Sequence, residues 1–366
     1  MGPRSSEPAR PLSFAGGPSI LPPEVLAEVQ QAVGEWGCSG HSVLELPFTG
    51  HEYAAIQSEA ETDLRALLGL PPQYCVLFLQ GGAYAQFRLV PLNLLGPNEC
   101  AAYVETGYWS ERAASEARSV CRVVVAAHDR NRVPPPATWR IPEEAAYCHI
   151  TGNETADGVQ FHHFPALDHV ELVGDLTADL LTGPVDIERF GLIYASAQKN
   201  LGAAGLTVVI VRDDLLDRAR PGIPGPLDYA RQVASRSRVN TPPVFAVFVA
   251  GRMLKWLRRH GGLAQAAARC QRRSERLYAA IEASDLYRCR VSREDRSRIS
   301  VCFHLADASL ESDFLAEAER RGLHHLKGHP AQGGIRACLY NAMPESGAAV
   351  LAEFMAEFAH IHRACV

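Results

Sequence analysis

Short apolar runs recur along residues 75–211, and this pattern constrains the possible folds more than any other feature of the sequence. Six such runs are predicted as strands, at residues 75–79, 120–127, 145–150, 170–174, 191–195 and 206–211. Continuous apolar runs are typical of strands that are buried on both faces of a sheet. Several of the segments between them are long enough to hold crossover helices. The pattern therefore predicts an α/β layer architecture.

Apolar residues at helical spacing predict helices on both sides of this region. Pro22-Pro23 suits the first turn of one helix, and Gly69 suits the end of another. The predicted helices span residues 22–36, 56–68, 245–260, 269–284 and 348–362, with a further strand at 300–304.

The chain has 366 residues, a length that favours two domains. We predict a flexible tail over residues 1–12, a large domain over residues 13–260 and a smaller domain over residues 261–366. Apolar residues make up 47% of the chain, which excludes a disordered protein, and no apolar run approaches the roughly 18 residues of a membrane span. The net charge of −5 gives no general attraction to nucleic-acid phosphates. We therefore expect neither membranes nor nucleic acids as partners.

The ten cysteines indicate a compartment rather than a disulfide framework. They show no Cys-x-x-Cys motif and no regular spacing, and Cys75, Cys121, Cys148 and Cys302 lie in apolar runs. This distribution favours reduced, mostly buried thiols. The first residues contain no apolar signal segment. We therefore expect a cytoplasmic location, and we predict no metal site.

Only three lysines occur in the chain, Lys199, Lys255 and Lys327. Lys199 follows a predicted buried strand, where a lysine is costly unless it has a partner or a chemical task. One such task is a Schiff base, because desolvation lowers the pKa of the amine and keeps it nucleophilic. The alternative is a surface lysine at a strand end. Lys255 lies on the basic face of a predicted helix, and Lys327 lies in a loop.

Three further features suit a flat, phosphorylated ring, although each has an ordinary structural alternative. Asp175 ends a predicted strand 24 residues before Lys199, where a carboxylate pairs with a pyridinium nitrogen or caps a turn. The Gly81-Gly82 turn lets backbone N–H groups approach a phosphate, or simply closes a turn. Trp109 stacks on a flat ring or belongs to the core.

Seven longer stretches make the sequence similar to one enzyme family. They are FAGGPSILPPEVL, PLNLLGP, TGYWSERA, GNETADGV, IYASAQKNLGAAGLTVVIVRDDLL, NTPPVFA and LKGHPAQGGIRACLYNAMP. From about Phe14 to its C-terminus the chain resembles the phosphoserine aminotransferase family, whose fold-type I enzymes use pyridoxal 5′-phosphate (PLP). The resemblance implies a mostly parallel seven-stranded sheet between helices and a smaller C-terminal α/β domain. It also implies ping-pong transfer of an amino group between an amino acid and a 2-oxo acid.

The resemblance implies a role for each matching residue. Lys199 matches the lysine that joins PLP covalently and moves the substrate proton, and Asp175 matches the partner of the pyridinium nitrogen. Trp109 matches the residue that stacks on the ring, and Thr155 matches the one that bonds the ring oxygen. The residues that match those binding the cofactor phosphate are Ala83, Tyr84 and Gln198.

Two further matches imply a homodimer with shared active sites. Asn240 and Thr241 match residues that reach the cofactor phosphate from the neighbouring subunit. Arg336 matches the residue that binds the substrate α-carboxylate, a task that suits a planar guanidinium. His329 matches a residue beside the substrate.

The sequence departs from the family at positions that meet the distal anion of the substrate. Residues 47–50 replace the family's Ser-His-Arg-Gly, which places Phe48 and Thr49 where His and Arg are usual. Tyr84 and Pro330 likewise stand where arginine is frequent. A phosphate facing Phe48 loses a charge pair worth roughly 4 kcal/mol at about 4 Å and an effective dielectric of about 20. We therefore predict an altered side-chain specificity, with Phe48, Thr49 and Tyr84 in the substrate pocket.

Two kinds of alternative stay open on the sequence alone. If His51, Arg321 or Lys327 supplies the missing charge, the chain keeps the phosphoserine:2-oxoglutarate reaction of serine biosynthesis. A PLP-dependent lyase or desulfurase on the same fold is disfavoured, because Cys338 lies in a strand-like run rather than in a mobile loop. The intact cofactor motifs disfavour a protein without catalytic activity.

Overall fold

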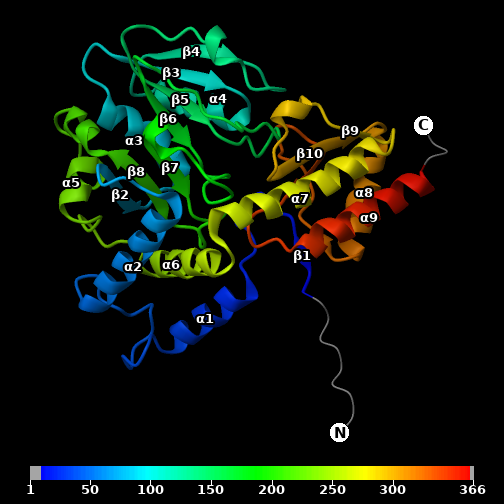
Figure 1. The fold of residues 1–366 in the computed structure, drawn as a ribbon, viewed down its shortest axis with the longest axis horizontal. Helices are drawn as coiled ribbons and strands as arrows, with labels where there is room; N and C mark the ends of the chain where they lie inside the picture. Colours follow the sequence, from blue (N-terminus) through cyan, green and yellow to red (C-terminus); the bar gives the residue numbers. More distant parts are fainter. Residues whose placement is uncertain (1–9, 363–366) are drawn as a thin grey trace.

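The computed structural model describes residues 10–362, which form a layered α/β part and a smaller C-terminal part (Figure 1). A seven-stranded sheet with the order β2-β8-β7-β6-β5-β3-β4 lies in the larger part. Its strands are β2 (Tyr74–Leu79), β3 (Cys100–Glu105), β4 (Val123–His128), β5 (Ala145–Thr151), β6 (Glu171–Asp175), β7 (Phe190–Ser196) and β8 (Thr207–Arg212). β8 runs antiparallel to β2 and β7, and the other pairs are parallel. The predicted α/β fold with a mostly parallel seven-stranded sheet is therefore confirmed.

Side chains from alternate positions of the strands enter two cores on opposite faces of this sheet. In β2, Val76 and Phe78 pack in a core with residues of α2 and α6, whereas Leu77 and Leu79 pack in a core with residues of α3 and α4. The helices of this part are α1 (Pro23–Gly34), α2 (His51–Leu68), α3 (Gly82–Leu94), α4 (Tyr108–Ala117), α5 (Tyr229–Ala234) and α6 (Val244–Arg259). The sheet is thus buried on both faces, as its continuous apolar strands require.

Three helices begin earlier than their apolar pattern indicates, and the difference is largest in α2 and α7 (Gly262–Glu282); the third, α9 (Glu345–Ile361), begins before residue 348. α2 begins at His51 rather than at residue 56, and α7 begins before residue 269. Their first turns carry mainly polar or small residues, so the apolar spacing starts later than the helix. Gly69 ends α2 with a φ of 61°, in the left-handed region that glycine favours. Within residues 10–362, no helix combines the length and the apolar character needed to cross a bilayer.

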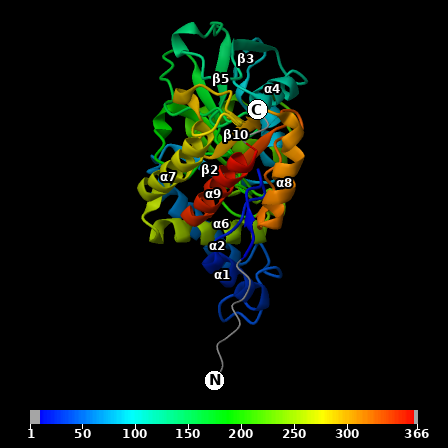
Figure 2. The same ribbon diagram turned by 90° about the vertical axis from the view of Figure 1, so that its right-hand side faces the viewer.

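The C-terminal part has an antiparallel sheet with the order β12-β10-β9 and three long helices. Its elements are α7, β9 (Tyr287–Arg288), β10 (Ser300–Leu305), α8 (Glu311–Arg320), β12 (Ile335–Cys338) and α9 (Glu345–Ile361). α7 and α9 lie side by side (Figure 2). Buried aromatic rings such as Phe303, Phe314 and Phe354 fill the core of this part.

The N-terminal segment joins the C-terminal part rather than the sheet that follows it in sequence. β1 (Leu12–Ser13) pairs in parallel with β11 (Leu323–His324), and Phe14 is fully buried in the C-terminal core. The predicted tail over residues 1–12 is therefore wrong at Leu12, while residues 1–9 lie outside the described residues. Burial of the apolar side chain of Phe14 stabilises the docked strand and explains the difference. A domain boundary near residue 260 stays a prediction.

Candidate active site

One cavity of about 360 Å³ lies where the carboxyl ends of β6 and β7 meet the first turns of α3 and α4. Open α/β sheets bind their ligands at this edge. Ten residues that the sequence analysis singled out line the cavity: Gly82, Ala83, Tyr84, Trp109, Thr155, Asp175, Gln198, Lys199, His329 and Arg336. The fold therefore gathers residues that are far apart in the sequence around one space.

Lys199 follows the end of β7 by three residues and lines the cavity with a half-buried side chain. Its Nζ donates a hydrogen bond of 3.5 Å to Oγ1 of Thr155. Desolvation by the surrounding protein lowers the pKa of Lys199, and the charge of Asp175 opposes part of this change. More of this amine is therefore neutral, and able to act as a nucleophile, than in an exposed lysine.

Asp175 is the last residue of β6 and is buried, with 5% of its surface exposed. Its Oδ1 accepts a hydrogen bond of 3.0 Å from the backbone N–H of Thr177. Burial raises the pKa of Asp175, whereas Thr177 and the charge of Lys199 lower it. A buried carboxylate that lines a cavity is stabilised by a cationic partner, and the protonated ring nitrogen of PLP is such a partner.

Trp109 supplies a flat wall beside the lysine. The centroid of its ring lies 6.0 Å from Nζ of Lys199. Its Nε1 donates a hydrogen bond of 2.8 Å to Oγ1 of Thr155, which restrains the orientation of the ring. Thr155 thus contacts both the amine and the indole, and the indole, which lines the cavity, suits stacking on a planar ligand.

The first turn of α3 lines another side of the cavity. Gly81 and Gly82 have φ values of 98° and 68°, in the left-handed region that glycine favours. The backbone N–H of Ala83 donates a hydrogen bond of 2.5 Å to Oγ of Ser196 at the end of β7. Apart from this bond, the first turn of a helix offers N–H groups that have no partner within the helix, and it carries the positive end of the helix dipole, so it favours an anion such as the PLP phosphate.

Together these features fit PLP. The amine suits covalent attachment, the buried carboxylate suits the ring nitrogen, the indole suits the ring face and the helix start suits the phosphate. No other ligand chemistry is needed to explain why these four groups surround one cavity.

Arg336 reaches the cavity from β12 in the C-terminal part. Its Nη1 donates a hydrogen bond of 3.1 Å to the backbone oxygen of Thr155. The N-terminal segment covers the guanidinium, because a Cβ on Gly16 would lie only 2.5 Å from Nη2 of Arg336. Gly17, with a φ of 131°, packs against the side chain of Lys199. A side chain at Gly16 would displace the guanidinium of Arg336, and the positive φ of Gly17 favours glycine.

Sequence reasoning missed several residues that line the cavity. They are Gly16, Gly17, Phe87, Thr151, Asn153, Thr177, Ala178 and Ser196. The Gly-Gly pair of the first quoted stretch is the one local signal among them. The others are small, polar or apolar residues near strand or helix ends, and only the folded sheet brings them together.

Four predicted site residues lie outside the cavity of their own protomer: Phe48, Thr49, Asn240 and Thr241. Phe48 is half-buried against the core of the larger part, and Thr49 is exposed. Asn240 and Thr241 are also exposed, and Nδ2 of Asn240 lies 3.4 Å from Oε1 of Gln80. Within one protomer, therefore, these four residues do not line the cavity.

The three residues considered as replacement cations also lie outside this cavity. Arg321 pairs with Glu317 and Glu357, on α8 and α9 of the C-terminal part. His51 and Lys327 are exposed. Within one protomer, therefore, none of them lines this cavity.

The profile of the aminotransferase class-V family matches residues 12–351, and the chain belongs to this family. The chain is 48% identical to the phosphoserine aminotransferase of Acidithiobacillus ferrooxidans over 355 residues, which cover 96% of this chain and 98% of that protein. It is 46% identical to the phosphoserine aminotransferase of Laribacter hongkongensis, with 96% and 99% of the two chains covered.

Solved structures show the same similarity. Phosphoserine aminotransferase from Bacillus circulans subsp. alkalophilus matches with a TM-score of 0.93 and 39% identity, over 95% of this chain and 98% of that one. PLP-bound phosphoserine aminotransferase from Trichomonas vaginalis matches with a TM-score of 0.91 and 34% identity, over 94% and 99%. This chain is a PLP-dependent aminotransferase that resembles phosphoserine aminotransferase, and it acts on amino acids and 2-oxo acids. The predicted enzyme class and cofactor are confirmed.

Burial and the charge of Asp175 have opposite effects on the pKa of Lys199, and this pKa can be measured in the cofactor-free protein. We expect the pKa of Lys199 to lie below the ordinary value of 10.5 and to fall further in Asp175→Asn, which removes the attraction. Competitive acetylation across pH, followed by mass spectrometry, gives this pKa. The lysine then binds its proton more tightly in the unfolded chain than in the folded one. The free energy of unfolding should therefore rise with pH between the folded and the unfolded pKa of Lys199. An ordinary pKa that Asp175→Asn leaves unchanged would contradict the account.

Proposed function

We propose that this aminotransferase works by a ping-pong mechanism and accepts a neutral, including aromatic, side chain rather than a phosphate. The charge of the cavity carries this proposal. Of the described residues that line it, only Lys199 and Arg336 have cationic side chains. Burial and the charge of Arg336 lower the pKa of His329, so this ring adds little charge at neutral pH. With Arg336 assigned to the substrate α-carboxylate, no cation of this protomer is left for a distal phosphate.

Three residues carry the proposed chemistry. PLP, when bound, supplies an electron-withdrawing ring that stabilises negative charge at the substrate Cα. Asp175 pairs with the proton on the ring nitrogen and keeps it in place. Nζ of Lys199 holds the cofactor in the resting enzyme and, once released, takes the proton from the substrate Cα. Arg336 binds the α-carboxylate through its planar guanidinium and so orients the amino acid.

Tyr84 gives the cavity a neutral aromatic wall where the family often has arginine. Its ring centroid lies 5.6 Å from that of Phe87, and 46% of the residue is exposed. Its hydroxyl donates a hydrogen bond of 2.6 Å to Oε1 of Glu116 and accepts one from Arg112. These contacts hold the ring in place and support a pocket for an uncharged side chain.

The phosphoserine:2-oxoglutarate reaction is the second candidate. The two relatives at 48% and 46% identity are phosphoserine aminotransferases. In addition, Arg88 and Arg112 share the single carboxylate of Glu116, which leaves one positive charge in excess beside Tyr84. For this candidate, either Arg112 leaves Tyr84 and reaches the distal phosphate, or a cation such as His51 comes from the second copy of the chain.

We also infer a homodimer in which each active site takes residues from both subunits. Phe48, Thr49, Asn240 and Thr241 lie outside the cavity of their own protomer, and the last three are exposed. The family resemblance assigns all four to a site, so a second copy supplies them.

A reducing, cytoplasmic location is the compartment we propose. The nine cysteines within residues 10–362 are all free thiols, which suits such a compartment.

A single-turnover screen of amino donors tests the side-chain specificity. Holoenzyme is mixed with phosphoserine, glutamate, or neutral and aromatic amino acids, and the cofactor absorbance is followed. We expect the best neutral or aromatic donor to react at least about tenfold faster than phosphoserine. The reason is that a phosphate loses its hydration in the pocket, and no cation there offsets this desolvation free energy. Faster reaction of phosphoserine would favour the second candidate.

The variant Phe48→His/Thr49→Arg refines this screen by restoring the family's cationic residues. We expect its reaction with phosphoserine to gain about tenfold or more over the unmodified enzyme. Leu44→Arg, at an exposed position of the same segment, is the matched control for added charge. An equal gain in both variants, or no gain, would contradict the assignment of Phe48 and Thr49 to the pocket.

Hybrid dimers test whether the sites are shared. Lys199→Ala inactivates its own site, and Thr241→Trp is expected to block the site of the partner. Reassembly of an equal mixture gives hybrids with one intact site, so we expect about a quarter of the normal activity. A mixture of Lys199→Ala and Asp175→Ala is the control, because both changes damage the chain's own site and no intact site forms. No recovery in the first mixture would contradict a shared site.

A further inference from the structure

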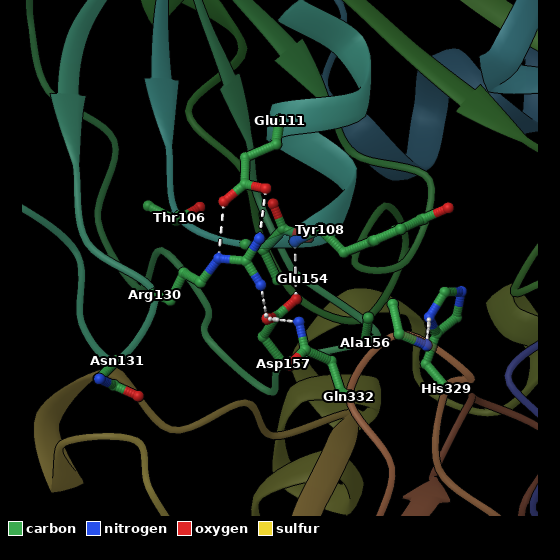
Figure 3. A network of polar contacts seen from close by, with 12 residues as sticks. Thr106, Tyr108, Glu111, Arg130, Asn131, Glu154, Ala156, Asp157, His329 and Gln332 are labelled. Carbon is green, nitrogen blue, oxygen red and sulfur yellow. Dashed lines mark hydrogen bonds and ion pairs between the residues drawn. The ribbon is translucent and has the colours of Figure 1, made fainter. Parts of the chain in front are cut away.

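Two carboxylates that the proposed reaction does not use lie at the first turn of α4. Glu154 is fully buried, and the side chain of Asp157 is 6% exposed. Glu154 accepts hydrogen bonds of 2.8 Å from the backbone N–H groups of Trp109 and Ser110. Asp157 accepts one of 2.8 Å from the backbone N–H of Tyr108 (Figure 3). Two acids therefore bind three consecutive N–H groups of this helix start.

We propose that both acids are positioning residues for the aminotransferase reaction. Glu154 fixes the plane of Trp109 at the cofactor site, and Asp157 ties the loop of residues 328–334 to α4. Neither acid lines the cavity, so each acts through a neighbour. The inference rests on the proposed cofactor role of this cavity, but it does not depend on which amino-acid side chain is accepted.

Trp109 is held at both ends by two adjacent residues. Its backbone N–H binds Glu154, and its indole Nε1 donates a hydrogen bond of 2.8 Å to Oγ1 of Thr155. One dipeptide therefore fixes both the start of the side chain and its far end. Because an aromatic ring stacks well only at a defined tilt and distance, this double attachment matters for a wall that receives a planar cofactor.

Gly107 makes the arrangement possible, because a side chain at this position would collide with both acids. A Cβ on Gly107 would lie 2.5 Å from Oδ2 of Asp157 and 2.8 Å from Cδ of Glu154. The residue before α4 thus has to be glycine for both carboxylates to reach the first turn of the helix.

Asp157 extends the arrangement to the C-terminal part. Nε2 of Gln332 donates a hydrogen bond of 2.8 Å to Oδ1 of Asp157 (Figure 3). His329, which lines the cavity, belongs to the same loop, and its ring centroid lies 4.4 Å from that of Tyr108 and 5.9 Å from that of Trp109. The acid therefore links two walls of the cavity that come from different parts of the chain.

The two acids have an electrostatic cost that their surroundings offset. Burial and the nearby charge of Asp157 raise the pKa of Glu154 to about 8, and burial raises the pKa of Asp157 to about 6. Nη1 of Arg130 lies 3.9 Å from Oδ1 of Asp157, and the same guanidinium also pairs with Glu111 (Figure 3). The positive end of the α4 dipole also favours negative charge here. Such a cost, offset locally, is typical of functional positions.

A double-mutant cycle on cofactor affinity tests the role of Glu154. In Glu154→Gln, one carboxylate oxygen becomes an NH2 group, so only one of the two helix N–H groups keeps its acceptor. We expect the dissociation constant for PLP, measured by titrating the cofactor-free protein, to rise about tenfold. In a Trp109→Phe background the same change should have no further effect, because Glu154 acts through the indole.

Equal effects with and without Trp109 would overturn the proposal, and so would an unchanged affinity for PLP. The induced circular dichroism of bound PLP gives a second readout, which should weaken when the indole tilts. Asp307→Asn is the matched control, because Asp307 also accepts a backbone N–H bond at a helix start, from Ser309 in the C-terminal part. If Glu154→Gln does not fold, Glu154→Asp, which keeps the carboxyl group but shortens its reach, replaces it in the cycle.

Gln332→Leu tests the link to the loop. We expect KM for the best amino donor of the unmodified enzyme to rise about fivefold, while kcat and the dissociation constant for PLP stay within about twofold, because a released loop holds His329 less firmly. Gln271→Leu on α7 is the control. An unchanged KM would overturn the link. A protein without transaminase activity would instead refute the proposed function, and the PLP titration would still test Glu154.

Discussion

The active site depends on keeping an amine and a carboxylate away from bulk water at one edge of the sheet. Asp175 ends β6, and Lys199 follows the adjacent strand β7, so strand pairing sets how these groups are placed. Desolvation favours the neutral form of each, while the charge of each favours the charged form of the other. A cofactor that offers a cationic nitrogen to one and a covalent partner to the other relieves both costs, so cofactor binding also stabilises the folded chain.

The same cavity joins the two parts of the molecule. The N-terminal segment crosses it, where the hydroxyl of Tyr340 donates a hydrogen bond of 2.9 Å to the backbone oxygen of Gly16. Arg336 enters from β12 and binds the backbone of Thr155 in the larger part. Asp157 and Gln332 form a further link across the same boundary. Contacts that hold the two parts together are thus the contacts that place the walls of the site.

How far apart two interacting residues lie along the sequence decided how much the sequence could predict. The strands that precede Asp175 and Lys199 are local apolar runs, so the fold class followed from the pattern and the family resemblance. The same reasoning picked out nine of the predicted site residues that line one cavity. The sequence analysis did not predict β3, because the strand begins with Cys-Ala-Ala and alanine has a low β-propensity. β1 was missed because its partner β11 lies at the other end of the chain. Glu154 was missed because its task exists only when α4 is in place. Phe48 and Thr49 lie outside the cavity of their own protomer, so their place in a site rests on the proposed homodimer.

The most direct test of the account is to find which lysine carries the cofactor. Borohydride reduction of the holoenzyme makes the bond to PLP permanent, and digestion with mass spectrometry then locates it. The account predicts the label on Lys199, none on Lys255 or Lys327, and loss of the label in Lys199→Ala. A label on either of the other lysines, or one that survives in Lys199→Ala, would contradict the assignment of this cavity as the active site.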